Sequence, residues 1–397
     1  MAGELPKLVA DEIQARSGIL RLDPAWVARD WLPPGRRLGL PAEEYDLGER
    51  GYVCERWLAS TTKADNVVGP DDEGISSIRT TGGARINLAE AVAACGDLIL
   101  GSDYSTTHAG LGRLAKIFDY AVRIPLHIHP PLEFARRAGR NSKDEAYYFP
   151  PGVDMGPHPE SFLGVHPSLH RDRLWGELVD AVREWNDDRV LRHSPAYVQV
   201  PEEGFFIPSG VLHAPGTALT IELQEDSDSM AMFQALNAGA IISKRLLTKD
   251  VSEADLAEHG ETAPLHWIDW DANTDPSFYD NHRLVPLPLR DEPAASEVWI
   301  FYGSPKFCGK RLTLEPGARY GSRENGVFSL FVWRGVGTIG GVDVIGESHD
   351  RDELLVVHDR AVDELEYVNT GTEPLVVLKM FGPDLCPDAP SLPRRRF

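Results

Sequence analysis

Cysteine and long apolar runs are scarce in this chain, and both absences exclude whole classes of protein. Only four of the 397 residues are cysteine, they lie far apart, and no Cys-x-x-Cys pair occurs. We therefore expect neither a zinc finger nor a disulfide framework, which fits a reducing cytosol. No stretch reaches the roughly 18 apolar residues that a membrane span needs. Residues 1–20 mix charged with apolar side chains and lack the apolar core of a signal peptide, so we expect a cytoplasmic protein.

Positive charge is also scarce. The chain has 40 lysines and arginines against 61 aspartates and glutamates, and its formal net charge is -21. Such a surface repels nucleic acid and anionic membranes, and we expect neither as a partner. It would also repel a phosphorylated substrate, unless the binding pocket carries cations of its own.

Turn-forming residues and short apolar segments are abundant, and they predict a mainly β protein. The 30 prolines and 36 glycines are spread along the whole chain. Short strands are typical of such a composition. The predicted strands lie at 52–57, 121–130, 144–150, 197–200, 205–208 and 219–223, and throughout 296–382. The predicted helices lie at 6–17, 86–100, 110–118 and 159–186.

These elements suggest two β-rich domains. We predict a first domain at 1–260, with a helical insert at about 159–190. Residues 261–295 contain several Pro, Asp and Asn residues and are predicted to be a linker. Residues 296–397 are predicted to form the second β domain.

Four residues of the first domain have the spacing of a metal site. His127 and His129 are two residues apart on a predicted strand, so both point to the same side of the sheet. Glu145 lies on a predicted neighbouring strand, and His213 follows a Pro-x-Gly turn at the start of another. Three imidazoles and one carboxylate suit Zn, Mn, Fe, Ni or Co, and leave positions open for water or substrate oxygens.

Five segments within about residues 45–240 carry further motifs. They are Glu55-Arg56-Trp57-Leu58-Ala59-Ser60, Leu126-His127-Ile128-His129-Pro130, Asn141-Ser142-Lys143-Asp144-Glu145, Phe206-Ile207-Pro208-Ser209-Gly210-Val211-Leu212-His213-Ala214 and Glu222-Leu223-Gln224-Glu225-Asp226-Ser227-Asp228. In sequence and in order they resemble segments of the class I mannose-6-phosphate isomerases, which are zinc-dependent cupins. The resemblance implies two cupin (jelly-roll) β-barrels in tandem, with the helical insert in or beside the first barrel and a metal-free second one. It also implies one divalent metal, with zinc as the first expectation and manganese or iron as alternatives.

Two positions depart from the family pattern. His127 stands where the family usually has glutamine, and three histidines with one glutamate resemble the set of manganese cupins. Met232 stands where the isomerases usually place an arginine that is tied to catalysis and phosphate contact. Lys244 and Arg245 are the alternative candidates for the positive charge that this arginine supplies in the family.

The resemblance implies an aldose–ketose isomerase, which must remove a proton beside a carbonyl and pass through a cis-enediolate. A metal stabilises the negative charge on the two adjacent oxygens, and a nearby base moves the proton. Glu222 and Lys143 are the predicted catalytic residues. Either is a candidate for the base, and the lysine could instead stabilise the enediolate by its charge.

The predicted function is therefore a metal-dependent isomerase of a sugar phosphate such as mannose 6-phosphate. An isomerase or epimerase of an unphosphorylated sugar of the lyxose or mannose type is the first alternative. An oxidative cupin that binds O₂, and a non-catalytic sugar-binding cupin, are the others. The expected partner is a small sugar or sugar phosphate, and a homodimer is the assembly considered.

Overall fold

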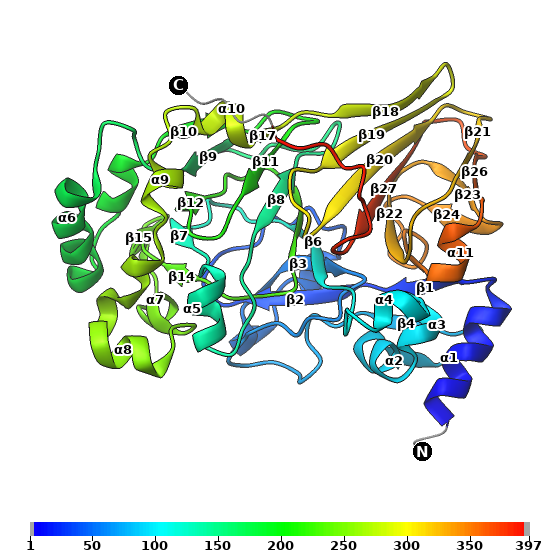
Figure 1. The fold of residues 1–397 in the computed structure, drawn as a ribbon, viewed down its shortest axis with the longest axis horizontal. Coiled ribbons are helices and arrows are strands. Elements are labelled where there is room, and N and C mark those ends of the chain that lie inside the picture. The colour runs from blue at the N-terminus through cyan, green and yellow to red at the C-terminus, as the bar shows by residue number, and fades with distance from the viewer. Residues whose placement is uncertain (1–3, 393–397) are drawn as a thin grey trace.

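The computed structural model describes residues 4–392 and shows a mainly β protein built from antiparallel sheets. Strands fill the centre and one end of the molecule, and helices gather at the other end and along one edge (Figure 1). The mainly β prediction is confirmed. Within the described residues, no helix is long and apolar enough to cross a membrane.

Two sheets form the part of the molecule that carries the predicted metal ligands. The order in the seven-stranded sheet is β17 (Arg283–Leu284), β11 (Gly204–Ile207), β8 (Glu145–Tyr148), β13 (Thr220–Glu225), β6 (Arg113–Phe118), β3 (Tyr52–Leu58) and β2 (Ala25–Arg29). The order in the five-stranded sheet is β10 (Ala196–Val198), β9 (Glu160–Leu163), β12 (His213–Ala214), β7 (His127–Ile128) and β14 (Ala231–Met232).

The remaining strands form a second β region, to which the N-terminal segment also contributes. Leu20 of β1 lies opposite Leu355 of β25, so the two ends of the chain share one sheet. The nine-stranded sheet runs β18 (Leu287–Glu292), β19 (Ala295–Phe301), β20 (Cys308–Leu314), β27 (Leu375–Phe381), β22 (Phe328–Arg334), β25 (Glu353–Val356), β1 (Ile19–Asp23), β4 (Ser77–Arg79) and β5 (Arg85–Asn87). The four-stranded sheet runs β21 (Arg319–Ser322), β26 (Leu365–Asn369), β23 (Val336–Ile339) and β24 (Val342–Ile345), and β15 (Leu236–Asn237) pairs with β16 (Ala240–Ile241).

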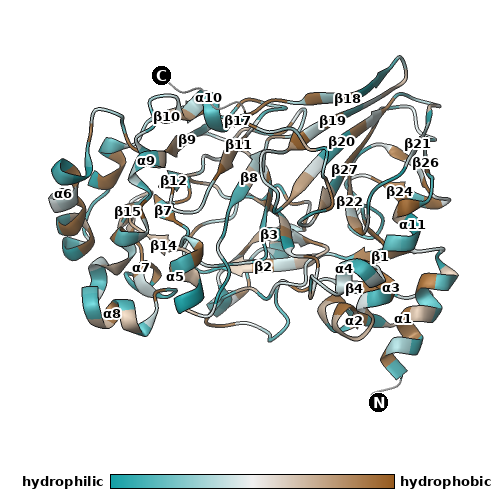
Figure 2. Ribbon diagram, viewed as in Figure 1, coloured by the Kyte–Doolittle hydropathy of each residue, from teal (hydrophilic) through white to brown (hydrophobic). Residues whose placement is uncertain are grey.

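Helices cover the edges of both regions. The predicted N-cap Asn87 accepts a hydrogen bond from the backbone N–H of Glu90 and begins α2. Helix α6 shows both hydrophobic and hydrophilic colour along its length (Figure 2), and its buried residues include Leu174 and Leu178. The α-helices are α1 (Glu4–Ala15), α2 (Leu88–Ala94), α3 (Gly96–Leu100), α4 (Ser102–Ser105), α5 (Leu132–Arg137), α6 (Arg171–Glu184), α7 (Arg245–Thr248), α8 (Glu253–His259), α9 (Trp270–Asn273), α10 (Phe278–His282) and α11 (His358–Val362), and 3-10 turns lie at Ala42–Glu44, Gly48–Arg50, Arg189–His193 and Gly260–Trp267.

The helix predicted at 110–118 is wrong, because this segment contains strand β6. All six residues of β6 are buried, and the strand lies between β3 and β13 in the sheet. A strand that is covered on both faces has a continuous apolar pattern instead of alternation, and periodicity alone does not distinguish it from a buried helix.

The segment predicted as a linker, 261–295, has secondary structure of its own. Its 3-10 turn ends at Trp267, and both Leu265 and Trp267 are buried in the same apolar cluster as α6. Strand β17 then pairs with β11 of the site-bearing sheet. The segment up to β17 therefore packs with the first region, and the division into domains stays a prediction.

A disulfide joins Cys308 of β20 to Cys386, which corrects the expectation that the chain has none. The two cysteines are 78 residues apart in sequence, so no local pattern pairs them. The bond fixes the C-terminal segment, which also packs by a hydrogen bond from the Gly303 N–H to the Pro390 carbonyl.

Replacing Cys386 with serine is expected to lower the free energy of unfolding by about 2–4 kcal/mol, because the cross-link restricts the unfolded chain. Urea unfolding of both proteins, with and without a reductant, measures the effect. The reductant should abolish the difference between them. An unreduced wild-type protein with four free thiols would contradict the disulfide.

Candidate metal centre

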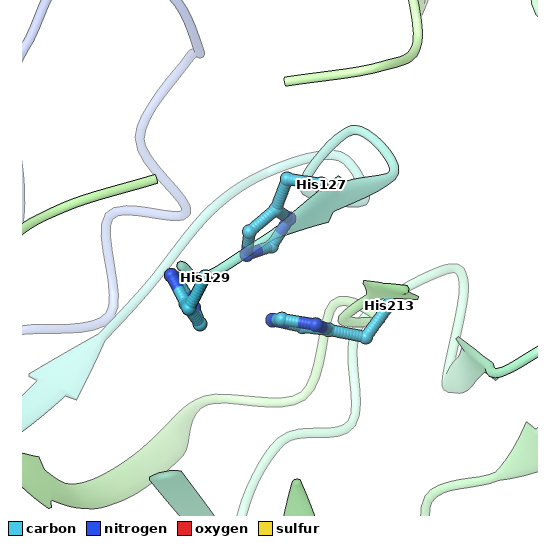
Figure 3. Close-up of side chains that lie close together, drawn as sticks. All are labelled: His127, His129 and His213. Atoms are coloured by element: carbon cyan, nitrogen blue, oxygen red, sulfur yellow. The ribbon is translucent and has the colours of Figure 1, made fainter. Parts of the chain in front are cut away.

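Three buried histidines converge between strands β7 and β12. His213 begins β12 and lies directly opposite His127 of β7, and His129 follows β7 by one residue. One ring nitrogen from each histidine lies within 4.8 Å of the others, and the rings point toward one another (Figure 3). The three histidines therefore form one cluster because β7 and β12 pair in this register.

Backbone carbonyls orient each ring. The Nδ1 atoms of His127, His129 and His213 lie 2.8, 2.7 and 2.9 Å from carbonyl oxygens of Pro125, Ser229 and Val211, respectively. A carbonyl only accepts hydrogen bonds, so each Nδ1 carries the proton and each Nε2 keeps its lone pair. Such an outer hydrogen bond fixes the tautomer and orientation of metal-binding histidines.

Glu145 brings a carboxylate to the same point. It begins β8, is fully buried, and its two oxygens each lie 3.0 Å from an Nε2 atom, one of His129 and one of His213. The His213 Nε2 is buried without a hydrogen-bond partner and faces Glu145 Oε1 at 3.0 Å, so the lone pairs of a ring nitrogen and a carboxylate oxygen meet there. Buried polar atoms are normally paired, so these atoms fit a bound cation. The four predicted ligands therefore lie together, and their role as ligands stays a prediction.

The electrostatic environment favours the protonation states that a metal site requires. Burial, followed by the neighbouring histidines His213 and His129, holds the pKa of His127 well below its usual value. Burial and the charge of Lys143 lower the pKa of His129 to about 3. Burial opposes ionisation of Glu145, but Lys143 and the histidines outweigh it and lower the pKa of this carboxyl. Neutral imidazoles at His127 and His129 and an ionised carboxylate at Glu145 result.

The two predicted catalytic residues lie beside this cluster. The Nζ atom of Lys143 is 2.9 Å from Glu145 Oε2 and 3.3 Å from Glu222 Oε1. Burial would lower the pKa of Lys143, but Glu145 and Glu222 outweigh it, so the pKa rises and the lysine stays charged. Burial and the charge of Glu145 raise the pKa of Glu222 to about 7. The structure thus places both residues in the pocket and leaves their roles as predictions.

Sequence reasoning missed two cations of the pocket. Lys116 of β6 has its Nζ atom 3.3 Å from Glu222 Oε2 and 3.7 Å from Glu55 Oε2. Arg29, at the end of β2, donates hydrogen bonds to Glu55 and to Asp228. In the sequence, Lys116 stands between apolar residues of β6, which indicates a buried lysine. Because this segment was predicted to be a helix, Lys116 was not identified as a residue of the site.

Comparison with known proteins gives the fold. No family profile matches the chain, and no curated protein matches it by sequence. The mannose 6-phosphate isomerase from Bacillus subtilis is 14% identical with a TM-score of 0.62, over 91% of this chain and 99% of that one. A mutant of phosphomannose isomerase from Salmonella typhimurium is 12% identical with a TM-score of 0.59, over 92% and 100% of the two chains. The chain therefore has the fold of the mannose-6-phosphate isomerases, and the resemblance is confirmed at that level.

Proposed function

We propose that the protein is a metal-dependent aldose–ketose isomerase of sugars. One observation carries the proposal. A buried cluster of three histidines and one glutamate shares its pocket with a carboxylate and an ammonium group, Glu222 and Lys143, which can move or stabilise a proton. A site that only stores a metal needs neither group.

The pocket residues divide the chemistry between them. A divalent ion held by His127, His129, Glu145 and His213 would supply Lewis-acid stabilisation of negative charge on adjacent substrate oxygens. Glu222, whose Oε1 and Oε2 lie 3.3 Å from the ammonium groups of Lys143 and Lys116, supplies the carboxylate that can accept the proton from the carbon beside the carbonyl. The protonated Glu222 then returns a proton to the neighbouring carbon, and burial slows the exchange of this proton with solvent without preventing it.

Lys143 is the second candidate for the base. Its ammonium group lies within 3.3 Å of both Glu145 and Glu222. In that position it can stabilise negative charge on the substrate, and it orients Glu222 through the ion pair. We assign the base to Glu222 and the charge stabilisation to Lys143.

Zinc remains the first proposal for the metal, with manganese and iron as alternatives, because three imidazoles and one carboxylate do not select strongly among them. The two proteins with a similar fold are a mannose 6-phosphate isomerase and a phosphomannose isomerase, which favours a sugar phosphate such as mannose 6-phosphate as the substrate. The surplus of acidic residues favours an unphosphorylated sugar of the lyxose or mannose type. The tandem cupin barrels with a helical insert, the homodimer and the cytoplasmic location also stay proposals.

Proton exchange tests the proposal. The metal-loaded protein is incubated in D₂O with mannose, lyxose, fructose and the 6-phosphates of mannose and fructose, and elemental analysis identifies the metal. Deuterium at C1 or C2 of any of these sugars is the expected result, because the base exchanges its proton with solvent during isomerisation. A protein that holds one equivalent of metal and exchanges none of them would favour a non-catalytic or oxidative cupin.

A further inference from the structure

Every cation that lines the metal pocket is already paired with a carboxylate of the protein. From this pairing we infer that the substrate is an unphosphorylated sugar, an inference that rests on the proposed isomerase function. A phosphorylated substrate carries a dianion that needs cations with free donors. The argument therefore depends on how many such donors the pocket and its outer part offer.

Arg29 is the strongest candidate for a phosphate contact, and two carboxylates saturate it. Its Nε and one Nη atom lie 2.9 and 3.2 Å from the oxygens of Glu55. Its Nη atoms lie 2.9 and 3.1 Å from the oxygens of Asp228. The side chain is only 2% exposed, so it cannot turn outward to another partner.

The two lysines of the pocket are paired in the same way. Lys116 lies between Glu55 and Glu222, and Lys143 lies between Glu145 and Glu222. The pocket therefore contains four carboxylates against three cations. A divalent ion would change the sum of these charges from −1 to +1, but all three side-chain cations are already paired, so no free side-chain cation remains for a phosphate.

The outer part of the pocket, which shares Arg29, Trp31 and Met230 with the inner part, is no more basic. Its lysine, Lys249, lies 2.9 Å from Asp65 and 2.7 Å from Asp250. These two ion pairs neutralise the charge of the outer lysine.

The two outer arginines are paired as well. Arg50 lies 2.9 Å from Glu73, although its buried Nε has no hydrogen-bond partner, and Arg245 lies 3.4 Å from Asp30. Lys244, the other cation considered from sequence, pairs with Glu261 instead and is not among the residues that line the pocket. Arg245 has the longest of these pairs, which makes it the critical residue for a test.

Met232 adds no charge at the centre. It is fully buried in β14 and lies opposite His127, so an apolar thioether occupies a strand position next to the metal cluster. A phosphate at Arg29, Lys116 or Lys143 would displace a carboxylate from a buried cation, and that carboxylate would remain buried and unpaired. Sugar hydroxyls, in contrast, can donate to carboxylate oxygens and need no free cation.

The test compares mannose with mannose 6-phosphate, and fructose with fructose 6-phosphate, on the metal-loaded protein. We expect kcat/KM, measured by deuterium exchange, to be at least about 10-fold higher for the unphosphorylated sugar of each pair. Only the unphosphorylated sugars should raise the thermal unfolding midpoint. Higher kcat/KM for the phosphates would overturn the inference and leave the isomerase function intact. Exchange with none of the four would instead contradict the proposed function.

The variant Arg245→Ala removes the most weakly paired cation. We expect the ratio of kcat/KM between mannose and mannose 6-phosphate to stay within about twofold of the wild-type ratio. A loss confined to mannose 6-phosphate would show that Arg245 binds its phosphate, and would overturn the inference. Circular dichroism confirms that the variant is folded.

Discussion

Replacing His213 with alanine is expected to abolish both metal binding and isomerase activity. Changes to the groups that merely orient a ligand cost about 10–100-fold in metal affinity, so loss of a ligand itself should exceed about 100-fold. The His213 ring is fully buried and its Nε2 faces Glu145 Oε1 at 3.0 Å, so the substitution removes one donor nitrogen from the centre of the predicted ligand set. Elemental analysis after dialysis measures the metal, which should fall from one equivalent per chain to none.

His158→Ala is the matched control. The side chain of His158 is 51% exposed and lies near Glu160, away from the cluster. This variant should keep one equivalent of metal and wild-type activity. A His213→Ala protein that is folded and retains one equivalent of metal would show that the ligand set is wrong.

The candidate site could be predicted from sequence because its ligands lie in short segments with local geometry. A His-x-His pair on a strand points to one side whatever the rest of the fold does. The Pro-x-Gly turn likewise delivers His213 to a strand start. The pairing of His213 with His127 across two strands is not a local property, and no motif of the sequence predicts that register.

The errors arose where a distant part of the chain decides the structure. Residues 113–118 form a central strand because β3 and β13 pair with the two edges of β6. The sequence of residues 113–118 alone does not reveal these partners. Cys308 and Cys386 meet because the C-terminal segment returns to β20, across 78 residues. Arg29 enters the pocket because β2 pairs with β3, so a residue far from every motif becomes part of the site.

Replacing Glu222 with glutamine is expected to lower kcat by about 10²–10⁴-fold, the usual contribution of a positioned general base. Glutamine keeps the size of the side chain and its place on β13 but cannot accept the proton. Metal content should remain one equivalent per chain, because Glu222 is not among the predicted ligands. Deuterium exchange into the substrate should fall in parallel with turnover, since both depend on the same proton transfer.

Glu253→Gln is the control. Glu253 is exposed in the first turn of α8 and does not line the pocket, so its replacement should leave kcat within about twofold of the wild-type value. If Glu222→Gln retains full exchange while Lys143→Met loses it, the lysine is the base and the assignment to Glu222 is wrong. If both variants lose exchange but only Lys143→Met also weakens sugar binding, Lys143 acts by charge. The two buried groups then act together, because each one sets the charge and position of the other through a 3.3 Å ion pair.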